Sequence, residues 1–218
     1  MRRPLRLAAV LFALGFAALA AARDHRPHAD GAGFDQYLMS LSWSPSYCAT
    51  HADESEQCGD RGFGFVLHGL WPQYRAGGGP QHCRTDAAPD EATIRRALAF
   101  MPSRRLIEHE WRTHGSCSGL DPADYFDLAD HAFASVRIPP PLIAPTRPPR
   151  LSAAGIVQAF RAVNPALPAA AVHVACRDGD VLAEVRVCLD RHDLAPRACG
   201  GGMRDTCRDG VLTIPAIR

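Results

Sequence analysis

The chain has 218 residues, of which 47% are hydrophobic and 22% are charged. That balance is typical of one globular domain, and it excludes a disordered chain, a collagen-like chain and a coiled coil. The formal net charge is only +1, and all 24 basic residues are arginine. A polyanionic partner must therefore be held at a local site, because there is no bulk positive charge to attract it.

The N-terminal segment has the composition of a secretory signal peptide. Three arginines among the first six residues precede an apolar run that ends in three alanines, a small-residue cleavage site, at Ala22. The run is shorter than the roughly 20 residues that a membrane span needs, which argues against a membrane anchor. We therefore expect a signal peptide over residues 1–22, one domain over residues 23–218, and a secreted or periplasmic protein that leaves the membrane once cleaved.

Hydrophobic periodicity predicts the elements that follow. Period-two alternation predicts strands over residues 37–43, 63–67, 172–176, 181–189 and 211–214, and the third and fourth form a hairpin. Helical spacing predicts helices over residues 94–101, 103–111, 121–136 and 152–163. Residues 48–61 and the proline-rich stretch 138–150 are expected as loops. Helices in the middle and strands at both ends predict a single α+β domain with a mostly antiparallel sheet.

Cysteine usage predicts a disulfide-stapled domain. An even number of cysteines behind a signal peptide is typical of a protein folded in an oxidising compartment. The absence of a C-x-x-C pair argues against a thiolate zinc site. Spacing leaves the pairing open, although four early and four late cysteines suggest two local sets. The eight cysteines are Cys48, Cys58, Cys83, Cys117, Cys176, Cys188, Cys199 and Cys207.

Residues able to carry chemistry concentrate in two short segments, residues 65–72 and 108–117. Together they hold three of the ten histidines and two of the three tryptophans. His68 lies where a predicted strand meets the sequence Gly-Leu-Trp-Pro, which we expect to expose it at a turn. His109 and His114 lie on a predicted helix. The other seven histidines do not cluster with a carboxylate and aromatic residues in this way, and we assign them no role.

The helix spacing defines what the second segment can do. Glu110 and His114 are four residues apart and share a helix face, so the carboxylate can orient the imidazole and stabilise its charged form. His109 and His114 are five residues apart, roughly 140° out of phase on a helix. They cannot chelate one ion as the i, i+4 histidines of a zinc protease do. We therefore expect no metal and no cofactor.

A pair of histidines suits the cleavage of RNA by internal transfer. That reaction needs a base for the 2′-OH proton, an acid for the departing 5′-oxygen, and donors or cations around the phosphorane. Histidine has the right pKa range for both proton transfers. Because the substrate's own 2′-OH attacks, this chemistry selects RNA and excludes DNA.

The motifs resemble those of the ribonuclease T2 family. Residues 68–72 (HGLWP) match the family's first active-site segment, and residues 109–117 (HEWRTHGSC) resemble its second, HEWxKHGTC. Residues 43–48 (WSPSYC) also resemble the family's opening W-P-x-x-Y-C, and the resemblance extends from about Phe34 to Leu120. It implies a T2-like α+β fold and a secreted endoribonuclease of low base specificity. Such an enzyme gives 2′,3′-cyclic phosphates and then 3′-phosphates, without a metal.

The resemblance implies roles for the catalytic residues. His114 would take the 2′-OH proton and His68 would protonate the leaving oxygen, an assignment that could be reversed. Glu110 would tune His114, and His109 would hold the phosphate. The implied disulfides are Cys83–Cys117, which joins the two segments, and Cys48–Cys58.

The resemblance also implies residues that bind a base, and the sequence departs from the family pattern at a position near His114. Trp71 would stack on a base, with Tyr74 a weaker candidate, and such stacking tolerates any base. Ser116 replaces a threonine and keeps its hydroxyl, but Thr113 stands where the family has a lysine that stabilises the phosphorane charge. Losing that cation costs a few kcal/mol of transition-state stabilisation unless an arginine replaces it. An alternative therefore stays open: a catalytically weak T2-like fold that acts as an RNA-binding, toxin or interaction module. In either case we expect a monomer.

Overall fold

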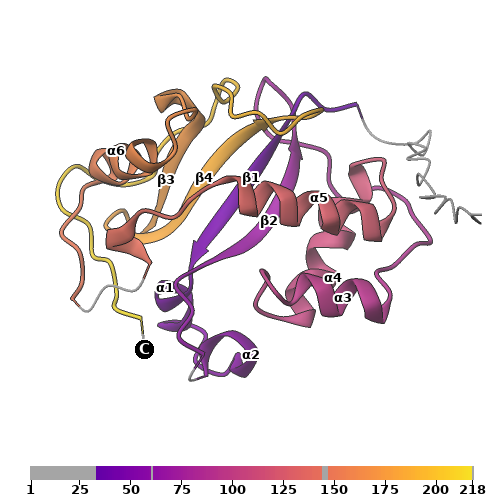
Figure 1. The fold of residues 1–218 in the computed structure, drawn as a ribbon, viewed down its shortest axis with the longest axis horizontal. Coiled ribbons are helices and arrows are strands. Elements are labelled where there is room, and N and C mark those ends of the chain that lie inside the picture. The colour runs from indigo at the N-terminus through magenta and orange to yellow at the C-terminus, as the bar shows by residue number, and fades with distance from the viewer. Residues whose placement is uncertain (1–32, 60, 144–146, 218) are drawn as a thin grey trace, which may run out of the picture.

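A four-stranded antiparallel sheet organises the part of the chain that the structure, a computed structural model, describes: residues 33–59, 61–143 and 147–217. The strands lie in the order β2-β1-β4-β3, so β1 and β4 are central (Figure 1). Their bounds are Gln36–Trp43 (β1), Phe65–Gln73 (β2), Val172–Arg177 (β3) and Val181–Asp190 (β4). The expected signal peptide over residues 1–22 lies outside the described residues.

Helices pack beside both edges of this sheet. α3, α4 and α5 gather near β2, and α6 lies beside β3 at the opposite edge (Figure 1). The α-helices are α1 (Ser44–Cys48), α2 (Ser55–Cys58), α3 (Glu91–Ala97), α4 (Arg104–Thr113), α5 (Pro122–Ser135) and α6 (Ala153–Val163). Short 3-10 turns are η1 (Gly115–Cys117), η2 (Pro140–Leu142) and η3 (Ala169–Ala171). None of the described helices is long and apolar enough to cross a membrane. The expected α+β class and antiparallel sheet are confirmed.

The alternation of β1 divides the sheet into two faces. Tyr37, Met39, Leu41 and Trp43 are at most 2% exposed and belong to the core that the helices cover. Trp111 of α4 is equally buried in this core, so two of the three tryptophans serve packing. Since successive side chains of a strand point to opposite faces, the serines of β1 lie on the other face.

A β-bulge interrupts the pairing of β1 with β2. Ser40 pairs with Gly69, but the next residue, Leu41, pairs with Leu67, so His68 is the extra residue of β2. Bulges re-aim a side chain and increase the local twist. β2 then continues to Gln73, so the prediction that His68 ends its strand is wrong: the bulge, not a turn, exposes the imidazole.

Side-chain caps set the start of the predicted helices. Asp90, Ser103, Asp121 and Ser152 each accept a backbone N–H three residues later, at the N-termini of α3, α4, α5 and α6. Such caps satisfy one of the free amides of the first turn. α4 ends at Thr113, so the prediction that His114 lies on this helix is wrong: His114 is the residue after it, with a non-helical backbone.

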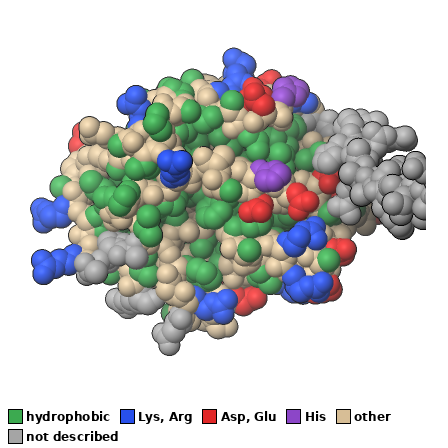
Figure 2. Space-filling model, viewed as in Figure 1, with side chains coloured by type: hydrophobic (Ala, Val, Ile, Leu, Met, Phe, Trp, Pro, Cys, Tyr) green, Lys and Arg blue, Asp and Glu red, His purple; other side chains and the backbone are tan. Residues whose placement is uncertain are grey.

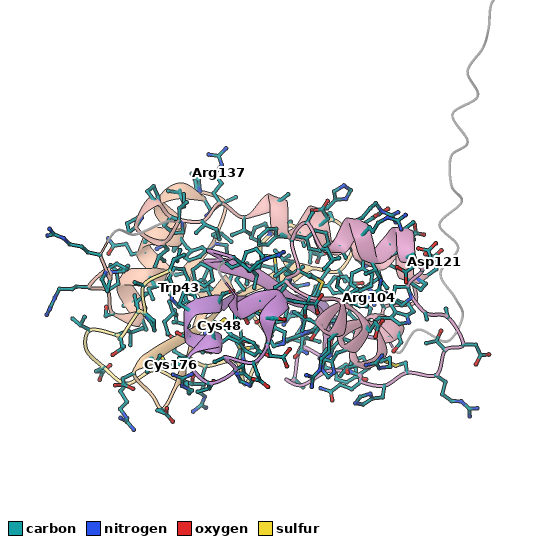
Figure 3. All side chains as sticks on the ribbon, turned by 90° about the horizontal axis from the view of Figure 1, so that it is seen from below. Trp43, Cys48, Arg104, Asp121, Arg137 and Cys176 are labelled. Carbon is teal, nitrogen blue, oxygen red and sulfur yellow. A yellow bond between two sulfur atoms is a disulfide. The ribbon has the colours of Figure 1, made fainter. Side chains whose placement is uncertain are left out.

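Four disulfides hold the chain together: Cys48–Cys58, Cys83–Cys117, Cys176–Cys207 and Cys188–Cys199. The first two are the pairs that the family resemblance implies. The other two, left open by spacing, tie the tail of the chain to the β3–β4 hairpin. Figure 3 shows Cys48 and Cys176 near Trp43, where α1 approaches the hairpin, and Arg177 donates to the carbonyl of Ser46 there.

Two local predictions are wrong. The expected loop over residues 48–61 contains the helix α2, and α1 begins directly after β1. The expected strand over residues 211–214 does not form; Thr213 makes only an isolated bridge to Val181. The amide of Leu212 donates to the carbonyl of Leu151, which lies outside the sheet, so no continuous ladder forms here.

Candidate active site

His68 is held between two carboxylates. Its Nδ1–H donates a 2.7 Å hydrogen bond to Oε1 of Glu184 on β4, and its Nε2 lies 3.5 Å from Oε1 of Glu110 on α4. Burial lowers the pKa of His68, but the Glu184 hydrogen bond and the charges of Glu110 and Glu184 outweigh it and raise the pKa above its ordinary value. His68 is therefore suited to carry a proton near neutral pH. Its side chain is 32% exposed, so that proton can reach a ligand.

Glu110 connects α4 to the edge strand β2. Its Oε2 accepts a 2.7 Å hydrogen bond from Nε1 of Trp71, and the side chain is 1% exposed. Burial raises the pKa of Glu110 to about 7, against the opposing effects of His68 and Trp71. Gly69 makes room for this pair, since a Cβ there would lie 2.0 Å from Oε2 of Glu110.

The indole of Trp71 lies between the two expected catalytic histidines. Its ring centroid is 5.2 Å from that of His68 and 5.1 Å from that of His114. His114 is buried, and its Nδ1 has no hydrogen-bond partner among the described residues. Burial, reinforced by the charges of His109 and His68, lowers the pKa of His114 to about 4. His114 is thus neutral over most of the pH range and able to accept a proton.

A cleft opens beside His68. Its volume is about 340 Å³, and its lining includes His68, His109, Arg105, Arg112 and Tyr47. Burial and the charge of His68 lower the pKa of His109. A cleft with two arginines and two histidines has the donors that a phosphate requires.

A disulfide links the end of the second motif segment to the loop that follows the first. The disulfide Cys83–Cys117 joins the loop after β2 to the turn after α4, and the amide of His82 donates to the carbonyl of Thr113 at 2.8 Å. His82 has a φ of 53°, a left-handed conformation uncommon for a non-glycine residue. These links hold the end of α4, which carries His114, against the strand that carries His68.

Cations reach this cluster from outside the second motif. The guanidinium carbon of Arg186, on β4, lies 5.8 Å from the Trp71 ring centroid. Figure 2 shows arginines and acidic side chains interspersed over the face in view, consistent with the near-zero net charge. The described residues hold no group of three His, Cys, Asp or Glu side chains that could bind a metal ion.

Comparison with known proteins places this site in a family. The Ribonuclease T2 family model matches residues 34–199. The chain belongs to the ribonuclease T2 family. The T2 match extends well beyond Leu120 and thus includes α5, α6 and the β3–β4 hairpin.

Relatives of this T2 protein occur in bacteria and plants. A ribonuclease of Aeromonas hydrophila is 48% identical over 96 residues, which is 44% of this chain and 43% of that protein. A probable ribonuclease of Haemophilus influenzae is 32% identical over 131 residues, which is 53% of this chain and 48% of that protein. The matched region thus spans less than half the length of either relative.

Solved structures share the T2 fold. An RNase-related protein from Calystegia sepium superimposes with a TM-score of 0.67 at 20% identity, over 86% of this chain and all of that one. RNase NT, solved in complex with 5′-AMP, gives a TM-score of 0.65 at 22% identity, over 84% of this chain and 99% of that one. At such identities the likeness concerns the fold.

The structure brings together most, but not all, of the expected site residues. His68, Trp71, Glu110 and His114 form one cluster, and His109 lines the adjoining cleft. Tyr74 follows the end of β2 and is 38% exposed.

One expected contact differs. Glu110 was expected beside His114, with which it shares a helix face, but it bonds Trp71 and approaches His68. The reason is that β2 packs against α4, so the carboxylate contacts the strand and not its neighbour one helical turn away.

Sequence reasoning missed Glu184 and Arg186 altogether. The available signal was the presence of two charged residues inside an otherwise apolar strand.

Proposed function

We propose that this chain is an endoribonuclease that cleaves RNA by transfer of the phosphoryl group to the neighbouring 2′-oxygen, without a metal. The proposal rests on two histidine rings that lie on either side of the Trp71 indole and whose pKa values are shifted in opposite directions. The pKa of His114 is lowered to about 4, whereas that of His68 is raised. Two titratable groups whose pKa values are pushed apart are suited to act as base and acid in the same reaction.

The proposed first step begins at His114. Its neutral imidazole accepts the proton of the 2′-OH while the 2′-oxygen attacks phosphorus, and the bond between phosphorus and the 5′-oxygen breaks. His68 delivers its Nε2 proton to that leaving oxygen. The products are a 2′,3′-cyclic phosphate and a 5′-OH. In the second step His68 takes a proton from water as the water oxygen adds to phosphorus, and His114 returns its proton to the 2′-oxygen as the bond from phosphorus to that oxygen breaks. This leaves a 3′-phosphate and returns both histidines to their starting protonation states.

The remaining residues bind or stabilise in this scheme. His109 and the arginines of the cleft hold phosphate, and Glu110 stabilises the proton on His68 through the 3.5 Å approach. Trp71 offers part of its ring to a base, with the more exposed Tyr74 beyond it. Stacking on an aromatic ring is tolerant of sequence, which supports low base specificity.

A second candidate function rests on Thr113. In place of the family's lysine it leaves α4 without a cation next to His114, so a protein that binds RNA or a partner with little catalysis is the alternative. Arg186 and Arg112 are the arginines placed to compensate. For either function, the signal-like residues 1–22 and the four disulfides favour export to the periplasm or medium, and we propose a monomer there.

The test is RNA digestion by the exported, oxidised protein at pH 4 to 8 with EDTA present. We expect cleavage with 2′,3′-cyclic phosphate ends that convert to 3′-phosphates, and no digestion of DNA. His68→Phe and His114→Phe are each expected to lower kcat at least 1,000-fold, since each removes one proton-transfer group. The mass of the exported protein shows whether residues 1–22 are removed.

His131→Phe is the matched control, because His131 lies on α5 away from the histidine cluster and should leave kcat within twofold. A folded wild-type protein that binds RNA without cleaving it would favour the second candidate. Activity abolished by EDTA and restored by a divalent ion would refute the metal-independent scheme.

A further inference from the structure

A carboxylate of β4 reaches the proposed catalytic histidine across an intervening strand. β1 lies between β2 and β4, yet Oε1 of Glu184 accepts the Nδ1–H of His68 at 2.7 Å. The contact is possible because β1 presents serines here: Ser42 pairs with Glu184 and Ser40 with Arg186. Larger residues at these two positions would fill the space above β1 that the His68–Glu184 bond crosses.

Glu184 is itself held in place. Nε of Arg186 donates to its second oxygen, Oε2, at 2.8 Å, and Nη2 of Arg186 lies 2.7 Å from the same oxygen in an ion pair. The Glu184 side chain is 13% exposed. Burial alone would raise the pKa of Glu184, but His68 and Arg186 lower it to about 2. The carboxylate is therefore charged at every pH at which the protein is expected to work, and each of its oxygens has a partner.

We propose that Glu184, anchored by Arg186, is a positioning residue for His68 that fixes which ring nitrogen carries the transferable proton. The proposal rests on the acid role given to His68 under the proposed function. A carboxylate on Nδ1 keeps that nitrogen protonated, so Nε2 is the nitrogen that gains and loses the proton. Nε2, which lies 3.5 Å from Oε1 of Glu110, is the nitrogen that the proposed mechanism uses as the acid.

The local charges give the expected direction of the pH effect. Glu184 favours the charged form of His68, so its removal lowers the pKa of His68. Because His68 must be protonated to act as the acid, activity would then be lost at a lower pH than in the wild type. Among the described residues, the titratable and charged groups around His68 are Glu184 and Arg186 from β4, Glu110 and His109 from α4, and His114 directly after α4. The cleft beside His68 adds Arg105 and Arg112 of α4, Tyr47 of α1 and Glu54, which precedes α2. β1 contributes only uncharged serines at this point.

A second ion pair, between the last residue of β4 and Arg197 beyond the strand, offers a matched control. Asp190, six residues further along β4, accepts a 3.0 Å hydrogen bond from Arg197. This pair resembles Glu184–Arg186 in residue types and in partial exposure but bonds no imidazole. Any general effect of losing a carboxylate from β4 should therefore appear in Asp190→Asn as well.

The experiment compares Glu184→Gln, Glu184→Asp and Asp190→Asn with the wild type by kinetics over pH 4 to 9. Glu184→Gln keeps an oxygen that can accept the Nδ1–H of His68 but removes the charge, so we expect kcat to fall about 10-fold, with KM within twofold. The alkaline limb of its kcat profile should move down by about one pH unit. Glu184→Asp keeps the charge and should restore that limb, and Asp190→Asn should match the wild type.

NMR titration of the His68 ring gives a readout independent of activity. Its pKa should fall by about one unit in Glu184→Gln and stay unchanged in Asp190→Asn. An unchanged His68 titration and an unchanged pH profile, in a Glu184→Gln protein that melts like the wild type, would overturn the proposal. A wild type without ribonuclease activity would refute the proposed function instead, while the NMR titration would still decide whether Glu184 controls His68.

Discussion

Gly69 is the position at which the smallest change should do the most damage. A Cβ added to Gly69 would lie 2.0 Å from Oε2 of Glu110 and 2.4 Å from Nε1 of Trp71. Both distances are at least 1 Å shorter than ordinary contacts, and the Glu110 side chain is packed inside the protein at 1% exposure. Gly69→Ala must therefore separate Trp71 from Glu110 or displace β2.

The cost can be estimated from these contacts. Overpacking a tight site costs about 1–3 kcal/mol, and losing a hydrogen bond to a charged group costs about 1.5–3 kcal/mol. We expect Gly69→Ala to lower the free energy of unfolding by about 3–5 kcal/mol, or the Tm by about 10 °C for a domain of this size. Since Glu110 moves away from His68, kcat/KM for RNA should fall at least 100-fold.

Thermal melting and RNA cleavage, measured on the same preparation, test this. Gly155→Ala on α6 is the control, because its Cβ would meet neighbours only at 3.4 Å and beyond. That change should be neutral or stabilise by up to about 1 kcal/mol and leave activity intact. If Gly69→Ala melted within 2 °C of the wild type and cleaved RNA normally, the reasoning about the Trp71–Glu110 pair would be wrong.

Three further predictions concern the same site. Wild-type kcat should fall as pH drops through about 4, where the base His114 becomes protonated, and again above the raised pKa of His68; a pH profile of kcat checks both limbs. Trp71→Phe removes the hydrogen bond to the buried carboxylate, and kcat should fall about 10-fold while the fold is kept, as circular dichroism would show. Replacing Cys83 and Cys117 together by alanine opens a link of sequence separation 34 and should lower stability by about 4 kcal/mol in urea unfolding.

Local patterns were sufficient to predict the elements that carry the site. Helical spacing and the Ser103 cap predicted the helix that carries Glu110 and leads to His114, and alternation predicted the start of the strand that carries His68. The bulge could not be predicted, because it arises from the pairing of β2 with β1. Only the register with the partner strand shows that His68 is an extra, unpaired residue of β2. The same holds for residues 211–214, where the apolar pattern could not show that no continuous partner strand lies beside them.

Contacts between segments that lie far apart in the chain could not be predicted from the sequence. Glu184 lies 116 residues from His68 in the chain, and their meeting depends on the strand order β2-β1-β4. Spacing on α4 predicted Glu110 beside His114, but packing against β2 redirected the carboxylate. The late cysteine pairs were undetermined for the same reason, since many connectivities satisfy one spacing.

The extra residue in β2 separates the scaffold from its chemistry. The cross-strand pairs on either side of His68 are complete without it, so a strand one residue shorter at that point would keep the ladder with β1 in register. The strand pairing therefore does not require the insertion, whereas the His68 imidazole owes its direction to it. Under the proposed mechanism, a related chain that retains every core residue but lacks this one would keep its sheet and lose the acid of the reaction.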